Sequence, residues 1–505
     1  MSKARRLNRV LVANRGEIAV RVIRACREEG IESVAVFSEA DRHGLHVTLA
    51  DYAVEIGPAA ASDSYLNIDR LIDAAKEMEA DAVHPGYGFL AERAEFAEAV
   101  ANAGLIFVGP SASAIKAMGE KTEARRRMQE SGVPVVPGTV EPIDDVDEGV
   151  RTAEEIGFPV LLKAVAGGGG KGMRRIDASG DFKSGFEQAQ SEAKKSFGNG
   201  AVYIEKFIDR PRHVEIQVMA DSFGTTVHVG ERECSVQRRH QKMIEEAPSP
   251  AVSAELRQTM GNAAIKAAQS VGYVGAGTVE FLLDPSGTFY FLEMNTRIQV
   301  EHPITEMVYG VDLVREQLRV AAGQKVSFVQ ADVIPRGHAI ECRITSEDPY
   351  NGFLPRTGTV EHFEVPGGPG VRWDGGIGVG SEVGLHYDPL VGKLIVWGED
   401  RQRAIERMLR AIDEFVLVGL PTSIPFHRSV MGEPSFVSGE YDIGYLEQHG
   451  DELLQVRQDD LDGAIITAVL AEHRSRRLPK SKASEDSPET GSNWTRIARE
   501  ETLRW

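Results

Sequence analysis

At 505 residues the chain is too long for one typical hydrophobic core, so about two to four domains are expected. A hydrophobic content of 42% with 26% charged residues is typical of a soluble globular protein, and a net charge of -19 argues against nucleic acid as the main partner. No apolar run is long enough for a membrane span or a signal peptide, so a cytoplasmic protein without membrane contact is expected.

The first part of the chain alternates strand and helix. The pattern predicts a strand over 9–13, an amphipathic helix over 17–28 and further parallel strands over 33–37, 80–84 and 106–108. The first turn lacks G-x-G-x-x-G, so a dinucleotide site is not expected despite the Rossmann-like rhythm. Tyr87 follows the end of a strand, where open α/β sheets place ligands. A tyrosine packed in a turn is the plainer interpretation.

A glycine-rich loop follows in the next section. A helix is predicted over about 113–131, and a small α/β unit over about 136–207. Within that unit an apolar strand carries Lys163 and is followed by the glycine run 167–172, whose N–H groups could cradle phosphates while the lysine reaches one of them. The spacing is not that of a Walker A loop, and the run could equally be a floppy hairpin tip.

A hairpin with carboxylates on both strands comes next. Residues 277–283 and 288–292 are rich in β-formers and flank a Pro/Gly turn, which predicts two paired strands. This pairing would bring Glu280 close to Glu293 and Asn295. Two carboxylates in a half-buried sheet repel each other unless a cation lies between them, and Mg²⁺ with substrate phosphates fits that demand.

The segment 293–303 continues the second strand with charged residues at a two-residue period. In extended backbone Glu293 and Asn295 would share one face, and Arg297, Gln299 and Glu301 would share another if the extension continues. The second set offers a cation and a neutral donor for an anion, with a carboxylate that could take a proton. A solvated edge strand of mixed charge is the alternative.

Taken together, these segments resemble the ATP-grasp fold and, within it, the biotin carboxylase family. The resemblance covers about 9–447 and rests on the segments 12–18 (VANRGEI), 84–90 (HPGYGFL), 167–173 (GGGGKGM), 211–217 (PRHVEIQ), 237–242 (QRRHQK) and 293–303. It implies an α/β multidomain protein with a Rossmann-like N-terminal domain (1–118), an ATP-grasp domain (119–332) with a mobile lid at about 136–207, a mostly β C-terminal domain (333–450), and a helical or flexible tail (451–505).

The activity implied by the resemblance is that of an ATP-dependent ligase that carboxylates carrier-bound biotin with bicarbonate, via carboxyphosphate, as the first half-reaction of an acetyl-CoA or propionyl-CoA carboxylase. The implied catalytic residues are Glu301, Arg343, Lys242 and Arg297. Bicarbonate would be bound by Lys242, Arg297, Gln299 and the N–H of Val300, biotin by Tyr87 and Arg343, and Mg²⁺ (or Mn²⁺) by Glu280, Glu293 and Asn295. ATP would be bound by Lys121, Lys163, Gly168, Gly169, Gly170, Glu205, Lys206, His213, Gln237 and His240.

Several of these residues also have plainer interpretations. Glu205 and Lys206 could form a surface ion pair at a strand end, and His213 could be a core histidine. The run 237–242 could be a solvated basic face, and Arg343 could be buried against a carboxylate. The alternative functions are another ATP-grasp ligase, such as a carbamoyl-phosphate synthetase half or a purine-pathway carboxylase, and an inactive ATP-binding regulatory subunit.

The partners expected from the resemblance are a separate biotin carboxyl carrier protein and a carboxyltransferase subunit, because the chain has no Met-Lys-Met biotinylation site near its C-terminus. A homodimer or higher oligomer is also expected. The inserted residues 350–352 and the extended tail favour an acetyl-CoA or propionyl-CoA carboxylase, and a two-subunit pyruvate carboxylase is the alternative. A helix is predicted over 460–473. Trp494 and Trp505 beyond a polar linker favour docking of the tail on a partner, and docking on the subunit's own surface is the alternative.

Overall fold

The computed structural model describes residues 5–139, 141–143, 145–165 and 173–455, together with the two helical positions Ile466 and Val469. The chain divides into a unit of Met1–Leu454 and a second unit of Gln455–Trp505. The glycine loop with Gly168, Gly169 and Gly170 lies outside the described residues, as do nearly all of the predicted 460–473 helix and both tail tryptophans. No helix in the described part of the chain is long and apolar enough to cross a membrane.

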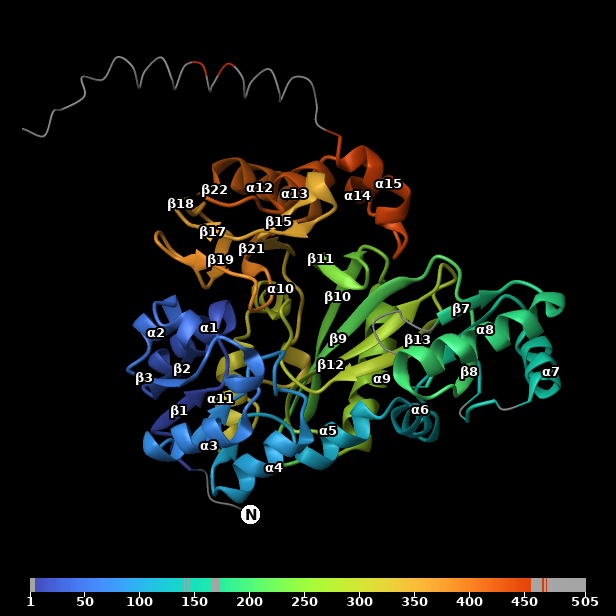
Figure 1. Ribbon diagram of the computed structural model, residues 1–505, viewed down its shortest axis with the longest axis horizontal. Coiled ribbons are helices and arrows are strands. Elements are labelled where there is room, and N and C mark those ends of the chain that lie inside the picture. The colour runs from blue at the N-terminus through green and yellow to red at the C-terminus, as the bar shows by residue number, and fades with distance from the viewer. Residues whose placement is uncertain are drawn as a thin grey trace, which may run out of the picture. The chain divides into compact units, whose positions relative to one another are not determined.

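The N-terminal part is built on a five-stranded parallel sheet with the order β3-β2-β1-β4-β5 (Figure 1). Its elements are β1 (Arg9–Val12), α1 (Gly16–Glu28), β2 (Glu32–Ser38), α2 (Leu45–Leu49), β3 (Tyr52–Gly57), α3 (Ile68–Glu77), β4 (Ala82–His84), α4 (Ala94–Asn102) and β5 (Ile106–Phe107). The predicted strand and helix alternation is confirmed.

The carboxyl ends of β1 and β4 place two loops side by side. β1 and β4 are neighbours in the sheet, so the segments that leave them emerge at the same edge. The amide of Asn14 donates to the carbonyls of Pro85 (2.8 Å) and Tyr87 (2.7 Å) and ties the loops together. Gly16 starts α1 with φ +61°, which a residue with a Cβ rarely adopts. This edge carries Tyr87 and the first turn of α1.

An eight-stranded sheet forms the centre of the first unit, with the order β13-β12-β9-β10-β11-β14-β21-β19. Every pairing in it is antiparallel. Its strands are β9 (Arg212–Ala220), β10 (Thr226–Arg238), β11 (Gln241–Ala247), β12 (Gly275–Leu283), β13 (Phe289–Asn295), β14 (His338–Thr345), β19 (Val371–Gly375) and β21 (Leu390–Gly398). Because β11 pairs with β14, the sheet runs without a break across the predicted boundary at 332/333, and the predicted domain boundaries stay predictions.

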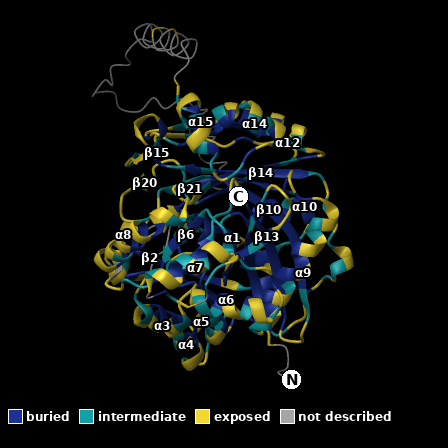
Figure 2. Cartoon of the chain, turned by 90° about the vertical axis from the view of Figure 1, so that its right-hand side faces the viewer, coloured by how far each residue is buried: buried dark blue, intermediate teal, exposed yellow. Residues whose placement is uncertain are grey.

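The two faces of this sheet differ in chemistry. Along β9, Val214, Ile216 and Val218 join an apolar core that also contains residues of α9 (Ala254–Ser270). The alternate residues Glu215 and Gln217 are fully buried polar groups on the other face. Figure 2 shows that β10 is almost entirely buried. The polar face is therefore a buried, charged surface that needs internal partners.

The predicted lid region forms a small unit of its own. A three-stranded antiparallel sheet, β7-β6-β8, packs against α7 and α8 around an apolar core separate from the others. Its elements are α7 (Val146–Ile156), β6 (Val160–Ala164), β7 (Met173–Ile176), α8 (Ser179–Phe197) and β8 (Val202–Lys206). The separate core is consistent with a unit that moves as a body, and its motion stays a prediction.

The single helix predicted over about 113–131 is wrong. The segment forms two helices, α5 (Ala112–Gly119) and α6 (Lys121–Glu130), separated by Glu120. The backbone of Glu120 is extended, with ψ 105°, so the α-helical hydrogen bonds cannot continue through it. The break makes Lys121 the first residue of a helix.

The C-terminal part packs helices on the far end of the central sheet. α10 (His302–Tyr309) and α11 (Leu313–Ala321) precede β14, and α12 contacts both β14 and β21. The later helices are α12 (Arg401–Glu414), α13 (Ile424–Met431), α14 (Pro434–Ser438) and α15 (Tyr445–Leu453). Short strands complete this part: β15 (Glu347–Asp348), β16 (Leu354–Pro355), β17 (Gly358–Thr359), β18 (His362–Glu364), β20 (Glu382–Val383) and β22 (Val416–Val418).

Candidate active site

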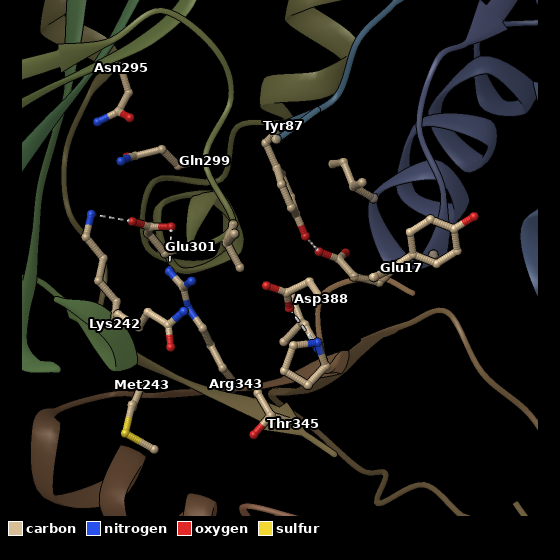
Figure 3. A pocket seen from close by; sticks show the side chains of 18 of the residues that line it. Glu17, Tyr87, Lys242, Met243, Asn295, Gln299, Glu301, Arg343, Thr345 and Asp388 are labelled. Atoms are coloured by element: carbon tan, nitrogen blue, oxygen red, sulfur yellow. Dashed lines mark hydrogen bonds and ion pairs between the residues drawn. The ribbon is translucent and has the colours of Figure 1, made fainter. Parts of the chain in front are cut away.

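A cavity of about 600 Å³ opens between the N-terminal loops, the polar face of the central sheet and the segment after Tyr387 (Figure 3). It gathers all of the residues predicted to bind bicarbonate, biotin and metal, although they come from distant parts of the chain. The predicted residues that line it are Tyr87, His213, His240, Lys242, Glu280, Glu293, Asn295, Arg297, Gln299, Val300, Glu301 and Arg343.

The predicted hairpin is confirmed with the register that the metal prediction needs. β12 and β13 are antiparallel, and Glu280 lies directly opposite Glu293 while Thr278 lies opposite Asn295. The amide of Asn295 donates to Glu280 Oε1 over 2.9 Å. Residues opposite each other in a sheet point to the same face, so both carboxylates face the cavity.

Glu293 and Asn295 share one face of β13 as predicted, but the extension that would give Arg297, Gln299 and Glu301 a common face is wrong. The strand ends at Asn295, the chain then bends and turns, and α10 begins at His302. Arg297 accordingly turns back to donate to Asn295 Oδ1 over 2.9 Å. Pro303 in the first turn of α10 favours a helix start there, and His302 Nδ1 lies 2.7 Å from the Gln299 carbonyl, which fixes the turn. The residues predicted to bind the anion therefore come together through a turn and not through a two-residue strand period.

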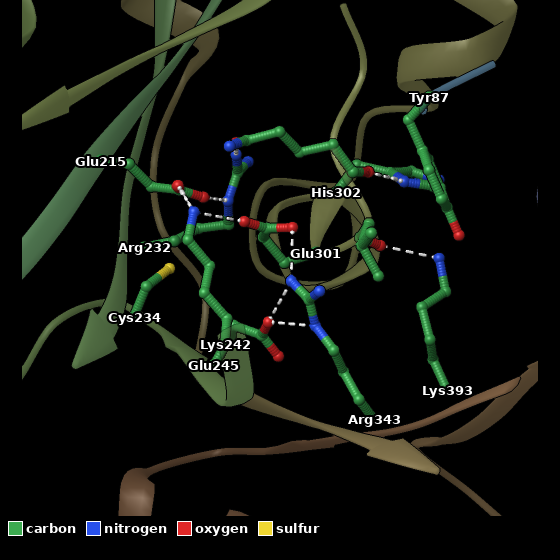
Figure 4. A network of polar contacts seen from close by, with 12 residues as sticks. Tyr87, Glu215, Arg232, Cys234, Lys242, Glu245, Glu301, His302, Arg343 and Lys393 are labelled. Atoms are coloured by element: carbon green, nitrogen blue, oxygen red, sulfur yellow. Dashed lines mark hydrogen bonds and ion pairs between the residues drawn. The ribbon is translucent and has the colours of Figure 1, made fainter. Parts of the chain in front are cut away.

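Glu301 lies between two cations. Its carboxylate accepts from Lys242 Nζ over 2.7 Å and from an Arg343 Nη over 3.0 Å, and its side chain is buried (Figure 4). Burial opposes its charge, but Lys242 and Arg343 together hold the pKa of this carboxyl well below its ordinary value. Glu301 is consequently held in its ionised form.

Lys242 joins three carboxylates at one point. Its ammonium donates to Glu215 (2.5 Å), Glu280 (2.8 Å) and Glu301 (2.7 Å), which uses all three of its protons. Although burial disfavours the charge, these carboxylates raise the pKa of Lys242 well above its ordinary value. A permanent positive charge thus lies between the predicted metal ligands and the predicted base.

Arg232, a fully buried residue that the sequence prediction did not include, supports this group. Its guanidinium pairs with Glu215 and donates to Gln299 Oε1 over 2.6 Å and to Gln217 Oε1 over 2.7 Å. Glu215 is therefore shared between Arg232 and Lys242. The available signals were the alternation of polar and apolar residues along 213–217 and the run of three charged residues at 231–233, both within segments rich in β-formers.

Arg343 combines the two interpretations offered for it. Its Nε donates to Glu245 Oε1 over 2.6 Å, so it is buried against a carboxylate, and it also lines the cavity and reaches Glu301. Burial and the nearby Glu301 outweigh Arg343 and raise the pKa of Glu245 to about 7. The arginine therefore keeps a strong hold on the ionised Glu301.

The residues predicted to hold the metal fit a hard divalent cation. Glu280 and Glu293 supply carboxylate oxygens and Asn295 an amide oxygen, the donor set that Mg²⁺ prefers. Burial and the adjacent Glu280 raise the pKa of Glu293, so the structure shows a repulsion that a bound cation would relieve. The buried side chains of His213, Glu215 and Glu280 also bring three possible metal-ligand atoms within 4.8 Å of one another. His213 Nε2 lies 3.0 Å from Glu280 Oε2.

The other residues that are predicted for ATP and lie in the described part of the chain do not line this cavity. Glu205 on β8 is paired with both Lys163 on β6 and Arg125 on α6 (2.7 Å to Arg125). The backbone N–H of Lys206 donates to the Pro137 carbonyl over 2.7 Å, and its ammonium to the Gly157 carbonyl over 2.7 Å. Lys163, Glu205 and Lys206 thus lie on neighbouring strands of the predicted lid.

Two more residues predicted for ATP, Gln237 and Lys121, interact with residues that line the cavity. The Gln237 amide donates to the Cys234 carbonyl over 3.1 Å and lies 3.3 Å from His213 Nδ1. The charge of Lys121, the first residue of α6, acts on the Glu293 carboxyl and favours its ionised form. Neither residue lines the cavity, but each lies beside one that does.

The N-terminal part adds residues to which the sequence assigned no role. Asn14, Arg15, Glu17 and Phe89 line the cavity, and the hydroxyl of Tyr87 donates to the buried carboxylate of Glu17. From the C-terminal part, Asp388 and Pro389 complete the wall (Figure 3). The segment 12–18 supported the resemblance, yet nothing in it indicated that Glu17 would meet Tyr87.

Comparison with known proteins agrees with this architecture. Residues 6–115 match the model for the biotin carboxylase N-terminal domain, 120–329 that for the carbamoyl-phosphate synthase L chain ATP-binding domain, and 341–448 that for the biotin carboxylase C-terminal domain.

Individual relatives cover almost the same part of the chain. The chain is 53% identical to a biotin carboxylase of Nostoc sp., over 88% of this chain and 99% of that protein. It is also 53% identical to a pyruvate carboxylase subunit of Methanothermobacter thermautotrophicus, over 88% of this chain and 90% of that one. A crystal structure of the biotin carboxylase domain dimer of Hydrogenobacter thermophilus 2-oxoglutarate carboxylase, in complex with MgADP, ADP and bicarbonate, has a TM-score of 0.83 and 45% identity, covering 90% of this chain and 99% of that one. The chain belongs to the biotin carboxylase family of ATP-grasp ligases.

Proposed function

We propose that this chain carboxylates biotin on a carrier protein, using bicarbonate and Mg-ATP, and that the acceptor of the carboxyl group is acetyl-CoA or propionyl-CoA. The observation that carries the site assignment is the ionised Glu301 held between Lys242 and Arg343 in the wall of one cavity. A buried base between two cations suits a small anion that must both bind and lose a proton.

Bicarbonate binding is assigned to the region around Lys242 and Arg297. At ~4 Å and an effective dielectric constant of ~20, each cation–anion contact is worth roughly 4 kcal/mol before desolvation costs. A bicarbonate that takes over part of the Lys242 and Arg343 contacts would weaken their hold on Glu301. The pKa of Glu301 would then rise, and the carboxylate would become a better base for the bicarbonate proton.

Biotin is assigned to the other side of Glu301, near Arg343 and Tyr87. The guanidinium of Arg343 is fixed by Glu245 and lines the cavity, where it can stabilise negative charge on the ureido oxygen once the phosphate released from carboxyphosphate has taken the N1′ proton. The Tyr87 hydroxyl is bound by Glu17, which fixes the ring as a wall of the site. Preorganised charge of this kind often contributes more to catalysis than any other single effect.

Nucleotide and metal are assigned to the neighbouring side of Glu280. Glu280, Glu293 and Asn295 would hold Mg²⁺, which neutralises charge on the transferring phosphoryl group when bound. Lys121, Lys163, His213, Gln237 and His240 would contact the phosphates, and Glu205 with the Lys206 backbone would contact the adenine edge. The glycine loop at 168–170 would cover the phosphates.

The acceptor and the partner proteins are proposed from the sequence. Tyr350, Asn351 and Gly352 form a short turn beside β15, in the segment whose insertion favours an acyl-CoA carboxylase. A homodimer, a separate carrier protein and a carboxyltransferase subunit complete the proposal, and the described relative from Hydrogenobacter is a dimer. A two-subunit pyruvate carboxylase is the second candidate, favoured by the Methanothermobacter relative, which is named as part of a pyruvate carboxylase.

The decisive assay measures phosphate release from ATP by the purified chain with bicarbonate, in the presence and absence of free biotin. Release that needs both bicarbonate and biotin is expected. Release that needs bicarbonate but ignores biotin would indicate another ATP-grasp ligase, and no release under any condition would indicate a regulatory subunit. Either result would overturn the proposal.

The partners are tested separately. Co-purification followed by identification of the bound carrier and transferase would assign the acceptor, and a transferase acting on pyruvate would reject the acyl-CoA assignment. Deletion of residues 476–505 should preserve activity with free biotin and weaken assembly of the complex. Assembly with unchanged affinity would end the idea that the tail docks on a partner.

A further inference from the structure

Lys393 is a buried lysine beside the site to which neither the motifs nor the proposed mechanism gives a role. It lies in the middle of β21, and its side chain is 0% exposed. A lysine is almost never fully buried unless it is paired, because its charge is costly to remove from water. Its partners therefore indicate what it is there to hold.

The first partner is the backbone of the turn between Asn295 and His302, which carries the residues assigned to bicarbonate. Lys393 Nζ donates to the Val300 carbonyl over 2.7 Å. That carbonyl belongs to the peptide unit that joins Val300 to Glu301, so its direction sets how Glu301 leaves the turn. The preceding carbonyl, that of Gln299, is bound by His302. Two successive carbonyls of the turn are thus fixed, one by a local contact and one by Lys393.

The second partner connects the N-terminal part. Lys393 Nζ lies 3.1 Å from Glu17 Oε1, and Glu17 accepts the hydrogen bond from the Tyr87 hydroxyl. The ammonium also lies 6.0 Å from the centre of the Tyr87 ring. Burial raises the pKa of Glu17, and Lys393 acts against that rise. One ammonium thus joins the turn before Glu301 to the carboxylate that orients Tyr87.

The sheet places Lys393 next to Arg343. The two residues are directly opposite each other in the β14–β21 pairing, so their side chains project from the same face. Arg343 reaches the Glu301 carboxylate, while Lys393 reaches the carbonyl one peptide before it (Figure 4). Neighbouring strands therefore hold the side chain and the backbone of the predicted base together.

We propose that Lys393 is a positioning residue that sets the Val300–Glu301 peptide for bicarbonate and, through Glu17, the Tyr87 ring for biotin. This inference rests on the proposed function, because it deepens the assignment of the same site. Lys393 does not line the cavity, so it acts through Val300 and Glu17 and does not touch substrate. It lies on β21 and connects Val300, beside the bicarbonate site, with Glu17 of the N-terminal part, beside the biotin site.

A purely structural ion pair would have the same burial, so the test must separate stability from positioning. Lys393→Met removes the ammonium but leaves Glu17 buried without its cation, which alone could unfold the protein. The double variant Glu17→Gln/Lys393→Met removes both members of this ion pair, so neither charge is left buried without the other. Arg401→Met is the matched control, because Arg401 pairs with the buried Glu246 (2.7 Å) away from the cavity.

The experiment measures melting temperature and the KM values for ATP, bicarbonate and free biotin in wild type, both Lys393 variants and the control. The double variant should melt closer to wild type than Lys393→Met. It should still show a bicarbonate KM raised about tenfold, the size expected when a hydrogen bond from a charged group is lost, with the ATP KM within twofold of wild type. Arg401→Met should lower the melting temperature and leave the bicarbonate KM within twofold.

The outcomes separate the proposed function from the positioning role. Wild-type protein without biotin-dependent ATP cleavage would overturn the proposed function itself. Active wild type with a double variant whose bicarbonate KM is within twofold of wild type would overturn the positioning role alone. An equal rise of the bicarbonate KM in Arg401→Met would show that lost stability, and not the Val300 contact, causes the effect.

Discussion

Replacement of Glu301 by glutamine gives the sharpest test of the proposed mechanism. Glutamine keeps the shape of the side chain and one acceptor oxygen but cannot take a proton from bicarbonate. The neighbouring cations keep other partners, since Lys242 retains Glu215 and Glu280, and Arg343 retains Glu245 over 2.6 Å. No buried cation is left alone, so the variant should fold.

The size of both effects follows from these contacts. Hydrogen bonds between charged groups contribute about 1.5–3 kcal/mol each, and the remaining amide oxygen can still accept one of them, so the free energy of unfolding should fall by no more than about 3 kcal/mol. Loss of a general base typically costs ~10²–10⁴-fold in rate, or roughly 3–5 kcal/mol in barrier height. Catalysis should therefore suffer far more than folding.

The assay follows biotin-dependent phosphate release as a function of bicarbonate, ATP and biotin. The turnover of Glu301→Gln should fall by at least about a hundredfold, while its KM for ATP stays close to that of wild type because Glu301 is assigned to bicarbonate. A variant that keeps turnover within threefold of wild type would refute the assignment of Glu301 as the base. A turnover loss with an equally raised KM for ATP would show that Glu301 serves the nucleotide instead.

Three further predictions concern the metal, the nucleotide and acid stability. Glu293→Ala should raise the magnesium requirement, whereas Arg297→Ala should mainly raise the KM for bicarbonate. Titration of each variant with magnesium and with bicarbonate distinguishes the two effects. Lys163→Met should raise the KM for ATP about tenfold. It should not unfold the predicted lid, because Glu205 keeps its ion pair with Arg125. Burial opposes the charge of Glu246, but His338 and Arg401 lower its pKa to about 2 from an ordinary 4.5, so its ionised form contributes about 3 kcal/mol above pH 4.5. Glu246→Gln should lose that contribution at pH 7, and its deficit should shrink as the pH falls from 4.5 toward 2.

Each of these predictions has an outcome that contradicts it. Identical magnesium and bicarbonate profiles for Glu293→Ala and Arg297→Ala would mean that the two residues serve one site. An unchanged KM for ATP in Lys163→Met, measured beside wild-type protein, would remove the lysine from the nucleotide site. Denaturant unfolding of Glu246→Gln and wild type at several pH values should converge in acid. A constant difference from pH 7 to pH 3 would show that Glu246 is not held ionised by its partners.

Much of the site was readable from local pattern. The two-residue period and the Pro/Gly turn of the hairpin fixed the pairing of Glu280 with Glu293, because strand periodicity and turn chemistry are local properties. The alternation of strand and helix likewise predicted the N-terminal sheet and the place of Tyr87 at its edge. The resemblance added roles to residues whose type alone allowed a surface or core position.

Other features depended on contacts that no local pattern encodes. The two-residue pattern predicted extended backbone after Asn295, but the chain turns there. The start of α10 and the contact of His302 with the Gln299 carbonyl determine the backbone conformation of this segment. The break at Glu120 likewise appears only in the folded chain.

By itself, the sequence determined the hairpin, the N-terminal sheet and the resemblance that supplied the candidate residues, since each depends on neighbours along the chain. Only the tertiary structure decided that Arg232, Glu17 and Lys393 would surround that site. A buried charge must find a partner, but the identity of that partner is set by which strands and loops pack together across hundreds of residues.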